Sequence, residues 1–461
     1  MRIIAFFTFH FVEFVFWEFW VAALFGPDLP ARRRELRTQR AAVRFRRMAV
    51  ELGGVLIKLG QFVSTRVDVL PPSVIRVLEG LQDEVRPADF AAIEAVLDEE
   101  LGDRLQDFTR FTPQPIAAAS LGQVYRATLP EHNVVVKVQR PGIERLVATD
   151  LGALEVVCRW SMRAAFIRRR ADMPQLLEEF SSVLWEELDY IAEANNAERF
   201  QRMFADDHGV AIPHVYRDYS TRRVLVMEDV QTIKITDYSA LEAAGIRRDE
   251  VARRLLDTYL TQVFVERFFH ADPHPGNIFI RPLDPDEALR LNGRLPVTQG
   301  RPFQLIFVDF GMVGKLTPQL VETLRQTFIA AGLRDARGLV NCYEQLGLLM
   351  PGADKERIIA AMKHAFDLSW GMSMDELSHL PREEWLAYSR EFQDLLFKIP
   401  FRFPQNLIYL GRCAAILSGI ATALDPDFSP AMEMQPYVKF LLEGGALDDA
   451  EPDARRRVWE D

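Results

Sequence analysis

Cysteine is scarce in this sequence, and positive charge falls short of negative charge. Three cysteines, Cys158, Cys342 and Cys413, lie far apart in 461 residues, without the close spacing of a metal site or a disulfide framework. We therefore expect buried thiols in a reducing compartment. The chain has 55 Lys and Arg against 66 Asp and Glu, a net charge of −11, which argues against nucleic acid as a partner.

The composition also excludes a disordered chain. Hydrophobic residues make up 49% of the sequence and charged residues 26%, which is ordinary for a globular protein. A chain of 461 residues can build two or more cores, so a two-lobed enzyme fits its length.

The most informative stretch is Phe268–Asn277, which reads FFHADPHPGN. It places Asn277 five residues after Asp272, the spacing of a phosphotransferase catalytic loop. In such a loop the aspartate receives or orients the attacking hydroxyl, and the asparagine reaches a magnesium ion. Further along the chain, Asp309 follows an apolar strand in the sequence VDFG and would be the second metal ligand. Together the two motifs predict an enzyme that uses ATP or ADP with Mg²⁺.

A lysine stands inside the apolar strand Val134–Val138. Burying Lys137 is costly unless an anionic group pairs with it, and nucleotide phosphates together with a helix carboxylate are the obvious partners. The acidic stretch Trp185–Glu193 offers that carboxylate, and on a continuous helix Asp189 and Glu193 share one face.

Two other pairs of polar residues allow more than one interpretation. Glu187 and Asp189 would point in nearly opposite directions on an ideal helix. If both serve the site, either they flank it from two directions or the helix is distorted. The helical stretch Glu51–Gln61 places Lys58 and Gln61 on one face, which by itself is typical of the solvated edge of a helix.

The turn Pro115–Val124 stands where a kinase would carry its glycine-rich phosphate loop. Glycines there let backbone N–H groups approach a phosphate, whereas alanine and serine fill this turn, so the approach must differ. These residues are Ala117, Ala118, Ala119 and Ser120. We expect them to bind the nucleotide together with Lys137 and with Glu228, which lies at the expected connection between two lobes.

The N-terminal segment joins an aromatic apolar stretch to a basic one. Ile3–Phe25 is long enough to span a bilayer, but Glu13 and Glu18 would each cost roughly 2–3 kcal/mol at its centre. We therefore expect neither a clean transmembrane helix nor a signal peptide. With the arginine-rich Ala31–Met48, it suits an anionic membrane surface on the cytoplasmic face of the cell membrane. The alternative is a helix packed on the protein's own body beside a solvated basic neighbour.

Several elements are expected around these motifs. Val251–Phe269 reads as a helix that leads into the catalytic loop, and Ile212–Tyr216 and Arg223–Glu228 read as strands. Arg402–Leu424 is apolar, but it contains Arg412 and other polar residues, so we expect a bundle helix there.

With these residues in hand, the chain resembles the UbiB/AarF atypical kinase-like family, which is linked in many organisms to ubiquinone biosynthesis. The resemblance runs from about Val50 to Asp427. Seven stretches carry it in order: IKLGQFVSTR, LPPSVIRVLEGLQDEV, AAASLGQVYRA, VVVKVQRPGI, ELDYIAEANNAERF, FFHADPHPGNIFI and VDFGMVG. The chain departs from its relatives at Leu121-Gly122, where they commonly carry other small or apolar residues.

The resemblance implies roles for several of these residues. Lys58 and Gln61 fall on the family's lysine-x-glycine-glutamine helix, which lies over the active site, meets Glu187 and Asp189 and limits access of peptide substrates. The helix glutamate that pairs with the strand lysine is then Glu193. The alanine-rich turn is tied to an altered nucleotide preference.

In the catalytic loop the resemblance makes Asp272 the catalytic residue that positions the acceptor. His270 supports this loop through packing and hydrogen bonds. His274 is ambiguous, because protein kinases often keep a lysine at its position.

The implied fold is α+β: a bilobal protein-kinase-like fold with a helical N-terminal extension over the active site and a helical C-lobe. We divide the chain into a membrane-associating segment (1–48), the helical extension (49–106), an N-lobe with inserted helices (107–230) and a C-lobe (231–461). The implied function is a UbiB-like kinase or ATPase that binds Mg-nucleotide and supports prenylquinone biosynthesis or lipid-related metabolism at a membrane. Its partners would include quinone-pathway lipids or enzymes.

Three other functions were considered. A conventional protein kinase is disfavoured because Leu316–Pro318 and a helix follow Gly311 closely, leaving no room for a long activation segment or an Ala-Pro-Glu anchor. Small-molecule kinases of the aminoglycoside or choline type have a similar loop but lack the Lys58–Gln61 helix. A nucleotide-binding regulatory scaffold without phosphotransfer is the third.

Overall fold

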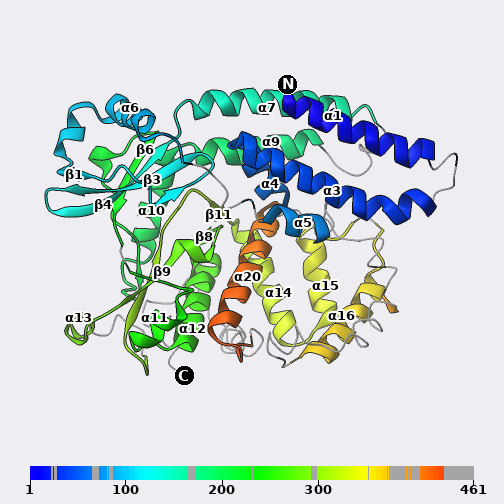
Figure 1. Ribbon diagram of the computed structural model, residues 1–461. Helices are drawn as coiled ribbons and strands as arrows, with labels where there is room; N and C mark the ends of the chain where they lie inside the picture. Colours follow the sequence, from blue (N-terminus) through cyan, green and yellow to red (C-terminus); the bar gives the residue numbers. More distant parts are fainter. Residues whose placement is uncertain are drawn as a thin grey trace. The chain divides into compact units, whose positions relative to one another are not determined.

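The computed structural model describes residues 1–21, 24, 28–64, 72–79, 81, 87–164, 173–230, 232–291, 298–350, 352–370, 372, 391, 392, 395 and 405–429. The chain divides into two compact units (Figure 1). Unit 1 contains Met1–Asn196 and His214–Asp229, and unit 2 contains Ala197–Pro213 and Val230–Asp461. Both units combine helices with β-sheet, which confirms the predicted α+β class. The finer division into four segments stays a prediction.

The sheet of unit 1 is antiparallel, with strand order β1-β3-β4-β6 and with β2 paired to β3. Its strands are β1 (Arg110–Phe111), β2 (Ala117–Ala118), β3 (Gly122–Leu129), β4 (His132–Gln139) and β6 (Val224–Glu228). Successive side chains of a strand point to opposite faces of its sheet. Val134, Val136 and Val138 of β4 therefore share an apolar core with α6 (Phe90–Leu101), and Lys137 points to the other face.

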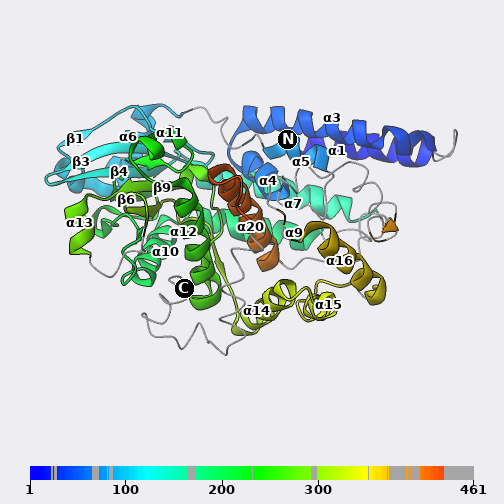
Figure 2. The ribbon, with the colours of Figure 1, turned by 90° about the horizontal axis from the view of Figure 1, so that it is seen from below.

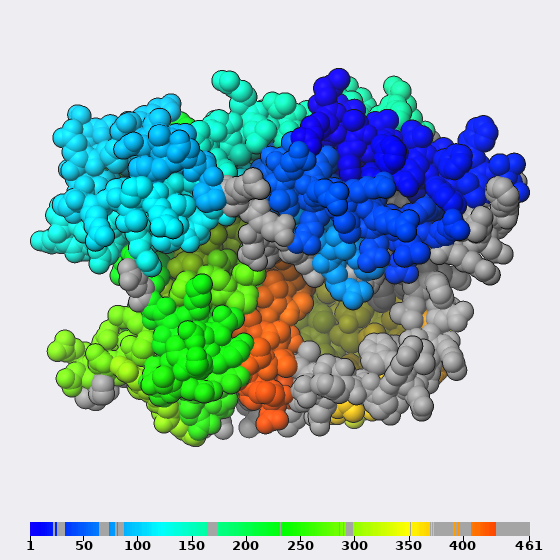
Figure 3. Space-filling model, in the orientation of Figure 1, coloured from blue at the N-terminus to red at the C-terminus, as the bar shows by residue number. Residues whose placement is uncertain are grey.

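A second core of unit 1 is built mainly by helices. They are α1 (Arg2–Val15), α3 (Asp28–Leu52), α4 (Val55–Ser64), α5 (Pro72–Glu79), α7 (Ile143–Ser161) and α9 (Met173–Glu187). The π-helical turn η1 (Phe16–Val21) follows α1, and α10 (Tyr190–Met203) continues from unit 1 into unit 2. Leu56 and Ile57 of α4 are fully buried in this core. Helices α1 and α3 lie side by side (Figures 1 and 2), with the rings of Phe6 and Phe45 6.0 Å apart. They form one face of unit 1 (Figure 3).

The described residues of unit 2 form two sheets. The strands of the larger sheet, in spatial order, are β5 (Val210–Ala211), β10 (Phe303–Phe307), β9 (Ile278–Pro282) and β7 (Ile233–Lys234); the smaller sheet pairs β8 (Phe268–His270) with β11 (Val313–Lys315). Its helices are α11 (Tyr238–Ala243), α12 (Arg248–Leu260) with the π-helical turn η4 (Thr261–Val265), α13 (Pro285–Arg290), α14 (Pro318–Gly332), α15 (Ala336–Gln345), α16 (Lys355–Ser369) and α20 (Gln405–Leu424). Phe269, Ala271 and Cys413 are buried in one core, so β8 and α20 share it.

Two expected elements differ in the structure. The helix expected over Val251–Phe269 stops at Val265, the backbone turns at Arg267 (φ 54), and Phe268 begins β8. The expectation was wrong because the short buried apolar pair Phe268-Phe269 suits a helix and a strand equally well.

The strand expected over Ile212–Tyr216 is also wrong. Strand β5 ends at Ala211, and of the expected residues Val215 makes an isolated bridge to Met227. Pro213 has no N–H to donate to a ladder, which explains why regular pairing does not continue through it.

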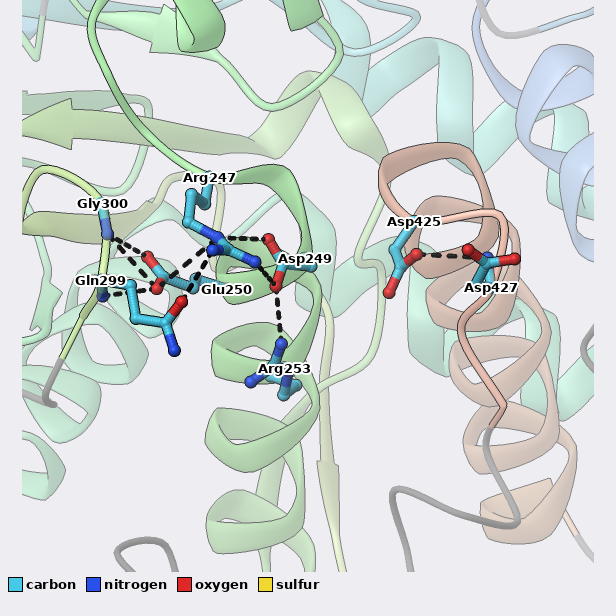
Figure 4. Close-up of polar contacts among 8 residues, drawn as sticks. All are labelled: Arg247, Asp249, Glu250, Arg253, Gln299, Gly300, Asp425 and Asp427. Carbon is cyan, nitrogen blue, oxygen red and sulfur yellow. Dashed lines mark hydrogen bonds and ion pairs between the residues drawn. The ribbon is translucent and has the colours of Figure 1, made fainter.

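The polar segment between β9 and β10 is hydrogen-bonded to residues at the start of α12 (Figure 4). Glu250 accepts the backbone N–H of Gln299 at 2.6 Å, and Arg247 donates to the Gln299 side chain at 2.7 Å. Arg247 and Arg253 both bind Asp249, and the hydrogen bond from Arg247 lowers the pKa of that carboxyl below its usual value. The segment is thus an ordered part of unit 2 where it rejoins β10.

Candidate functional site

Lys137 and Glu193 form an ion pair inside unit 1. The Nζ of Lys137 lies 2.8 Å from Oε1 and 2.9 Å from Oε2 of Glu193. Glu193 stands on the first turn of α10 and its side chain is 2% exposed, against 17% for the lysine. The ring of Tyr190 adds a cation–π contact, with its centroid 5.2 Å from Nζ. The structure thus brings together the two residues that the resemblance paired.

A break between α9 and α10 sets the position of Glu193. Asp189 lies outside both helices, and its Oδ1 accepts the backbone N–H of Ile191 at 3.0 Å and of Ala192 at 3.2 Å. It is therefore the N-cap of α10. The buried amide of Gln139, at the end of β4, donates to the carbonyl oxygen of Leu188 inside the break. The strand that carries the lysine thereby also fixes the helix that carries its partner.

The break falls between Glu187 and Asp189, while the N–H of Glu193 donates to the carbonyl oxygen of Asp189 at 3.1 Å, within the first turn of α10. Glu187 ends α9 and forms an ion pair with the Nζ of Lys58 on α4. Gln61 lies one turn further along α4 and is partly exposed. Of the four residues assigned to the lid, the structure brings Lys58 and Glu187 together and gives Asp189 a capping position. The distortion that the sequence left as one possibility is present.

The alanine-rich turn is held by backbone hydrogen bonds. The N–H of Ala119 donates to the carbonyl oxygen of Gly122 at 2.8 Å, and Nε of Arg140 donates to the Ala119 carbonyl at 3.0 Å. Burial lowers the pKa of Arg140 below its usual value. Ser120 is buried, and Ala117 is exposed. The turn thus has a defined shape with a largely exposed alanine tip.

Close packing explains why a glycine stands at position 122. A Cβ atom there would collide with the Tyr190 hydroxyl and would lie 2.9 Å from the carbonyl oxygen of Val138. Glycine therefore lets β3 pass the same ring that contacts Lys137.

Glu228 ends β6 at an exposed position. It pairs with Val134 across the sheet, whereas Lys137 pairs with Leu225. Its Oε2 accepts the backbone N–H of His214 at 3.2 Å. The structure does not show contact between Glu228 and the lysine pair.

Unit 2 contains the acidic motifs. The Nδ2 of Asn277 donates to the carbonyl oxygen of Asp272 at 3.3 Å. Because a carbonyl can only accept, the amide must turn its nitrogen toward it, and Oδ1 remains for a cation. In the same loop, Nδ1 of His274 accepts the backbone N–H of Gly276 at 3.2 Å.

His270 connects the two motifs. It is 1% exposed, its Nδ1 accepts the N–H of Asp272 at 3.3 Å, and its Nε2 lies 2.7 Å from the carbonyl oxygen of Asp309. The N–H can only donate and the carbonyl can only accept, so the imidazole carries its proton on Nε2. A neutral, buried ring with both nitrogens engaged supports the loop, as the sequence analysis expected.

Asp309 has a left-handed backbone, with φ 64, and its Oδ1 accepts the N–H of Gly311 at 3.4 Å. Among the residues that the structure describes, no group of three or more His, Cys, Asp or Glu is placed to hold a metal. One carboxylate and the Oδ1 of Asn277 nevertheless fit Mg²⁺, which keeps several waters and binds through one or two carboxylates plus substrate phosphates.

Arg412 is a site residue that the sequence analysis did not assign. Its Nη2 lies 2.8 Å from Oδ1 of Asp272. The adjacent Cys413 donates its thiol to the carbonyl oxygen of His270 at 3.5 Å, and burial raises its pKa to about 12. The sequence does contain a signal for this role, because Arg412 is a charged residue in an otherwise apolar helix. In the sequence this charge served only as an argument against a membrane span.

The chain is similar to several known proteins. The model of the ABC1 atypical kinase-like domain matches residues 80–343. The chloroplastic protein Activity of BC1 Complex Kinase 8 of Arabidopsis thaliana is 35% identical over 436 residues, covering 89% of this chain and 55% of that protein. An uncharacterized Synechocystis protein is 33% identical over 437 residues, covering 94% and 71%. The chain thus spans about half the length of the chloroplastic relative.

A solved structure has a similar fold. A Mycobacterium tuberculosis protein, determined in complex with erythromycin, matches with a TM-score of 0.54 and 22% identity, over 85% of this chain and 94% of that one. Together with the family model, this match confirms the predicted kinase-like α+β fold.

Proposed function

This chain belongs to the ABC1 atypical kinase-like family, and we propose that it is a magnesium-dependent phosphotransferase or ATPase with a non-protein acceptor. One observation carries the proposal: in unit 2, His270 joins the loop of Asp272 and Asn277 to Asp309. In unit 1, Lys137, which is paired with Glu193, is a cation of the kind that phosphotransferases use to orient phosphates.

Each residue has a separate task in this proposal. Asp309 and Oδ1 of Asn277 would hold the magnesium ion, and Lys137, oriented by Glu193, would contact the phosphates. Bound Mg·ATP would supply the phosphoryl group and a metal charge that offsets the negative charge of the transition state. Asp272 would hold the acceptor hydroxyl, or a water, in line with the phosphorus.

The test is the thermal stability of wild type and Asp309→Asn with ATP or ADP, with and without Mg²⁺. A ligand that binds the folded state stabilises it by about RT ln(1 + [L]/Kd). We expect a Mg²⁺-dependent rise in Tm that Asp309→Asn loses. No rise with either nucleotide would overturn the proposal. After a positive result, prenylated quinone precursors and other lipids are the acceptors to screen with radiolabelled ATP.

We also propose that the N-terminal helices bind an anionic membrane, on the cytoplasmic face of the cell membrane. Two described helices, Arg2–Val21 and Leu407–Leu424, are long and apolar enough to cross a membrane. The first is the candidate because 6% of its apolar window is buried, against 22% for the second, which carries Arg412 beside a core. Its exposed apolar side chains are Phe9, Val12, Phe16, Phe19 and Trp20.

The charge of Glu18, which argued against a clean transmembrane helix, is compensated within unit 1. Its carboxylate binds Arg34 and Arg37 of α3. Burial alone would raise the pKa of Glu18, but hydrogen bonds from these arginines lower it below its usual value. The buried Ile3 packs on the protein's own core, so one side of α1 is used internally. Residues 22, 23 and 25 of the predicted apolar stretch lie outside the described residues.

Flotation with liposomes tests the membrane proposal. Full-length protein should float with vesicles rich in anionic lipid, and protein lacking residues 1–48 should stay at the bottom. Phe9→Ser/Trp20→Ser, which changes exposed residues, should weaken flotation without lowering Tm. Equal flotation of the truncated and full-length proteins would overturn this proposal.

A further inference from the structure

The catalytic loop Phe268–Asn277 contains no lysine or arginine. His274 stands two residues after Asp272, where protein kinases often keep a lysine. Its Nδ1 accepts the N–H of Gly276, so this nitrogen carries no proton and the ring is neutral. The loop therefore does not itself place a positive charge beside its aspartate.

Arg412 of α20 places that charge from outside the loop. Its guanidinium binds Oδ1 of Asp272 at 2.8 Å, and the two side chains are 19% and 30% exposed. Within the described part of the chain, Nε and Nη1 of Arg412 and Oδ2 of Asp272 make no hydrogen bond, and none of the three is sealed from solvent. The pair therefore offers N–H donors and one carboxylate oxygen, side by side, to a ligand.

The position of Arg412 is fixed by its surroundings. The next residue, Cys413, is buried against Phe269 and Ala271 and donates its thiol to the carbonyl oxygen of His270. Two consecutive residues of α20 thus contact the catalytic loop. Such fixed donors stabilise a developing charge without the cost of reorienting them during the reaction.

We propose that Arg412 is a further catalytic residue, which binds the phosphoryl group during its transfer. The proposal rests on the phosphotransferase function proposed above. In the step, the acceptor oxygen bonds to the terminal phosphorus and the phosphorus–oxygen bond to ADP breaks, leaving its electron pair on ADP. The hydroxyl proton passes to Oδ2 of Asp272. Arg412 exchanges no proton; its planar N–H groups match phosphate oxygens.

The position of Arg412 in the chain makes this assignment independent of the family motifs. The family model matches residues 80–343, and Arg412 lies beyond them. An alternative is that the ion pair blocks Asp272 in a resting state. Removing the arginine would then raise turnover, whereas a phosphate-binding arginine would lower it.

Binding of a transition-state analogue tests the proposal without relying on turnover. The probes are Mg·ADP alone and Mg·ADP with aluminium fluoride, which imitates the phosphoryl group in transfer. Arg412→Gln retains a donor for Asp272, and Arg412→Lys retains the charge. The matched control is Arg248→Met, because Arg248 donates to the carbonyl oxygen of Ala423 at the other end of α20.

We expect Arg412→Gln to bind Mg·ADP as wild type does but to lose roughly 10- to 100-fold in affinity for the fluoride complex. Arg412→Lys should lose less, and Arg248→Met nothing. Unchanged affinity of Arg412→Gln for the analogue, or a rise in turnover, would overturn the proposal while leaving the phosphotransferase function intact. If Arg412→Gln does not fold, wild-type analogue affinity in Arg412→Met, which also removes the charge, has the same meaning. Failure of wild type to bind Mg·ADP would overturn the proposed function, and this proposal with it.

Discussion

The Nε2 of His270 lies 2.7 Å from the carbonyl oxygen of Asp309. One buried imidazole therefore couples the strand that leads to Asp272 with the turn that carries the second acidic residue. Because its Nδ1 also accepts the N–H of Asp272, the ring fixes the backbone at both aspartates without contacting either carboxylate. We therefore expect His270 to affect ligand binding by fixing where the two aspartates lie.

His270→Phe should unfold more easily than wild type. The phenyl ring fills similar space, but a buried N–H and a buried C=O lose their partners, at about 1–3 kcal/mol each. We expect the free energy of unfolding to fall by about 2–4 kcal/mol in urea titrations, and the Mg²⁺-dependent nucleotide shift to weaken. His132→Phe is the control, since His132 lies at the exposed start of β4. Equal losses in both variants would contradict the coupling role.

Lys137→Met should destabilise unit 1 by leaving the carboxylate of Glu193 buried without its cation. Breaking one side of a buried pair costs about 3–5 kcal/mol. The double variant Lys137→Met/Glu193→Leu should recover part of that loss, because it buries no charge. Chemical denaturation of the four proteins gives the coupling energy. Additive losses would show that the pair does not interact in solution.

Lys58→Ala and Glu187→Ala should change nucleotide turnover or autophosphorylation in the same direction and to a similar extent. Each removes one side of the same ion pair, so the double variant should add little to either single variant. Arg159→Ala is a control, since its ion pair with Glu155 on α7 is exposed. If these variants are as stable as wild type and their turnover is unchanged, the ion pair does not control access to the site.

Asp309→Asn should keep its stability within about 0.5 kcal/mol, because Asn tolerates a left-handed backbone. Asp309→Val should cost about 1–3 kcal/mol, since a β-branched residue is strained at φ 64. Thermal denaturation of both variants separates backbone strain from lost charge. A large loss in Asp309→Asn would mean that the carboxylate itself stabilises the fold, and the nucleotide test would need Asp309→Gly beside it.

Stability should fall with rising pH through Cys413. Burial raises its pKa from 9.0 to about 12, so above pH 9 the unfolded chain releases this proton while the folded chain keeps it. The stabilising contribution is complete below pH 9 and is lost as pH rises toward 12. Between pH 9 and 10.5 we expect a loss of about 2 kcal/mol, at 1.36 kcal/mol per unit. Cys413→Ala should show a shallower decline than wild type, and an unchanged slope would contradict this role of the buried thiol.

The sequence predicted features that depend on near neighbours. The apolar run Val134–Val138 predicted a buried strand with one lysine, and the structure places Lys137 in β4. The spacing of Asp272 and Asn277 indicated a loop whose two members are in fact hydrogen-bonded. Such local patterns are encoded by periodicity and by a few residue preferences.

Features that depend on distant contacts could not be predicted. The break at Leu188 contains neither Gly nor Pro, and it is held by Gln139, 49 residues earlier in the chain. Arg412 meets Asp272 only because α20 packs on the core that contains Phe269. A single sequence gives no pattern that joins residues so far apart.

The distance along the chain between Asp272 and Arg412 has a consequence for synthesis. The two residues are 140 positions apart, whereas Lys137 and Glu193 are separated by 56. At about 5–20 residues per second, a ribosome needs roughly 7–28 s to proceed from the aspartate to the arginine. A nascent chain can therefore form the ion pair of Lys137 and Glu193 long before Arg412 is available to pair with Asp272. The loop reaches its final charge balance only after Arg412 has been synthesised.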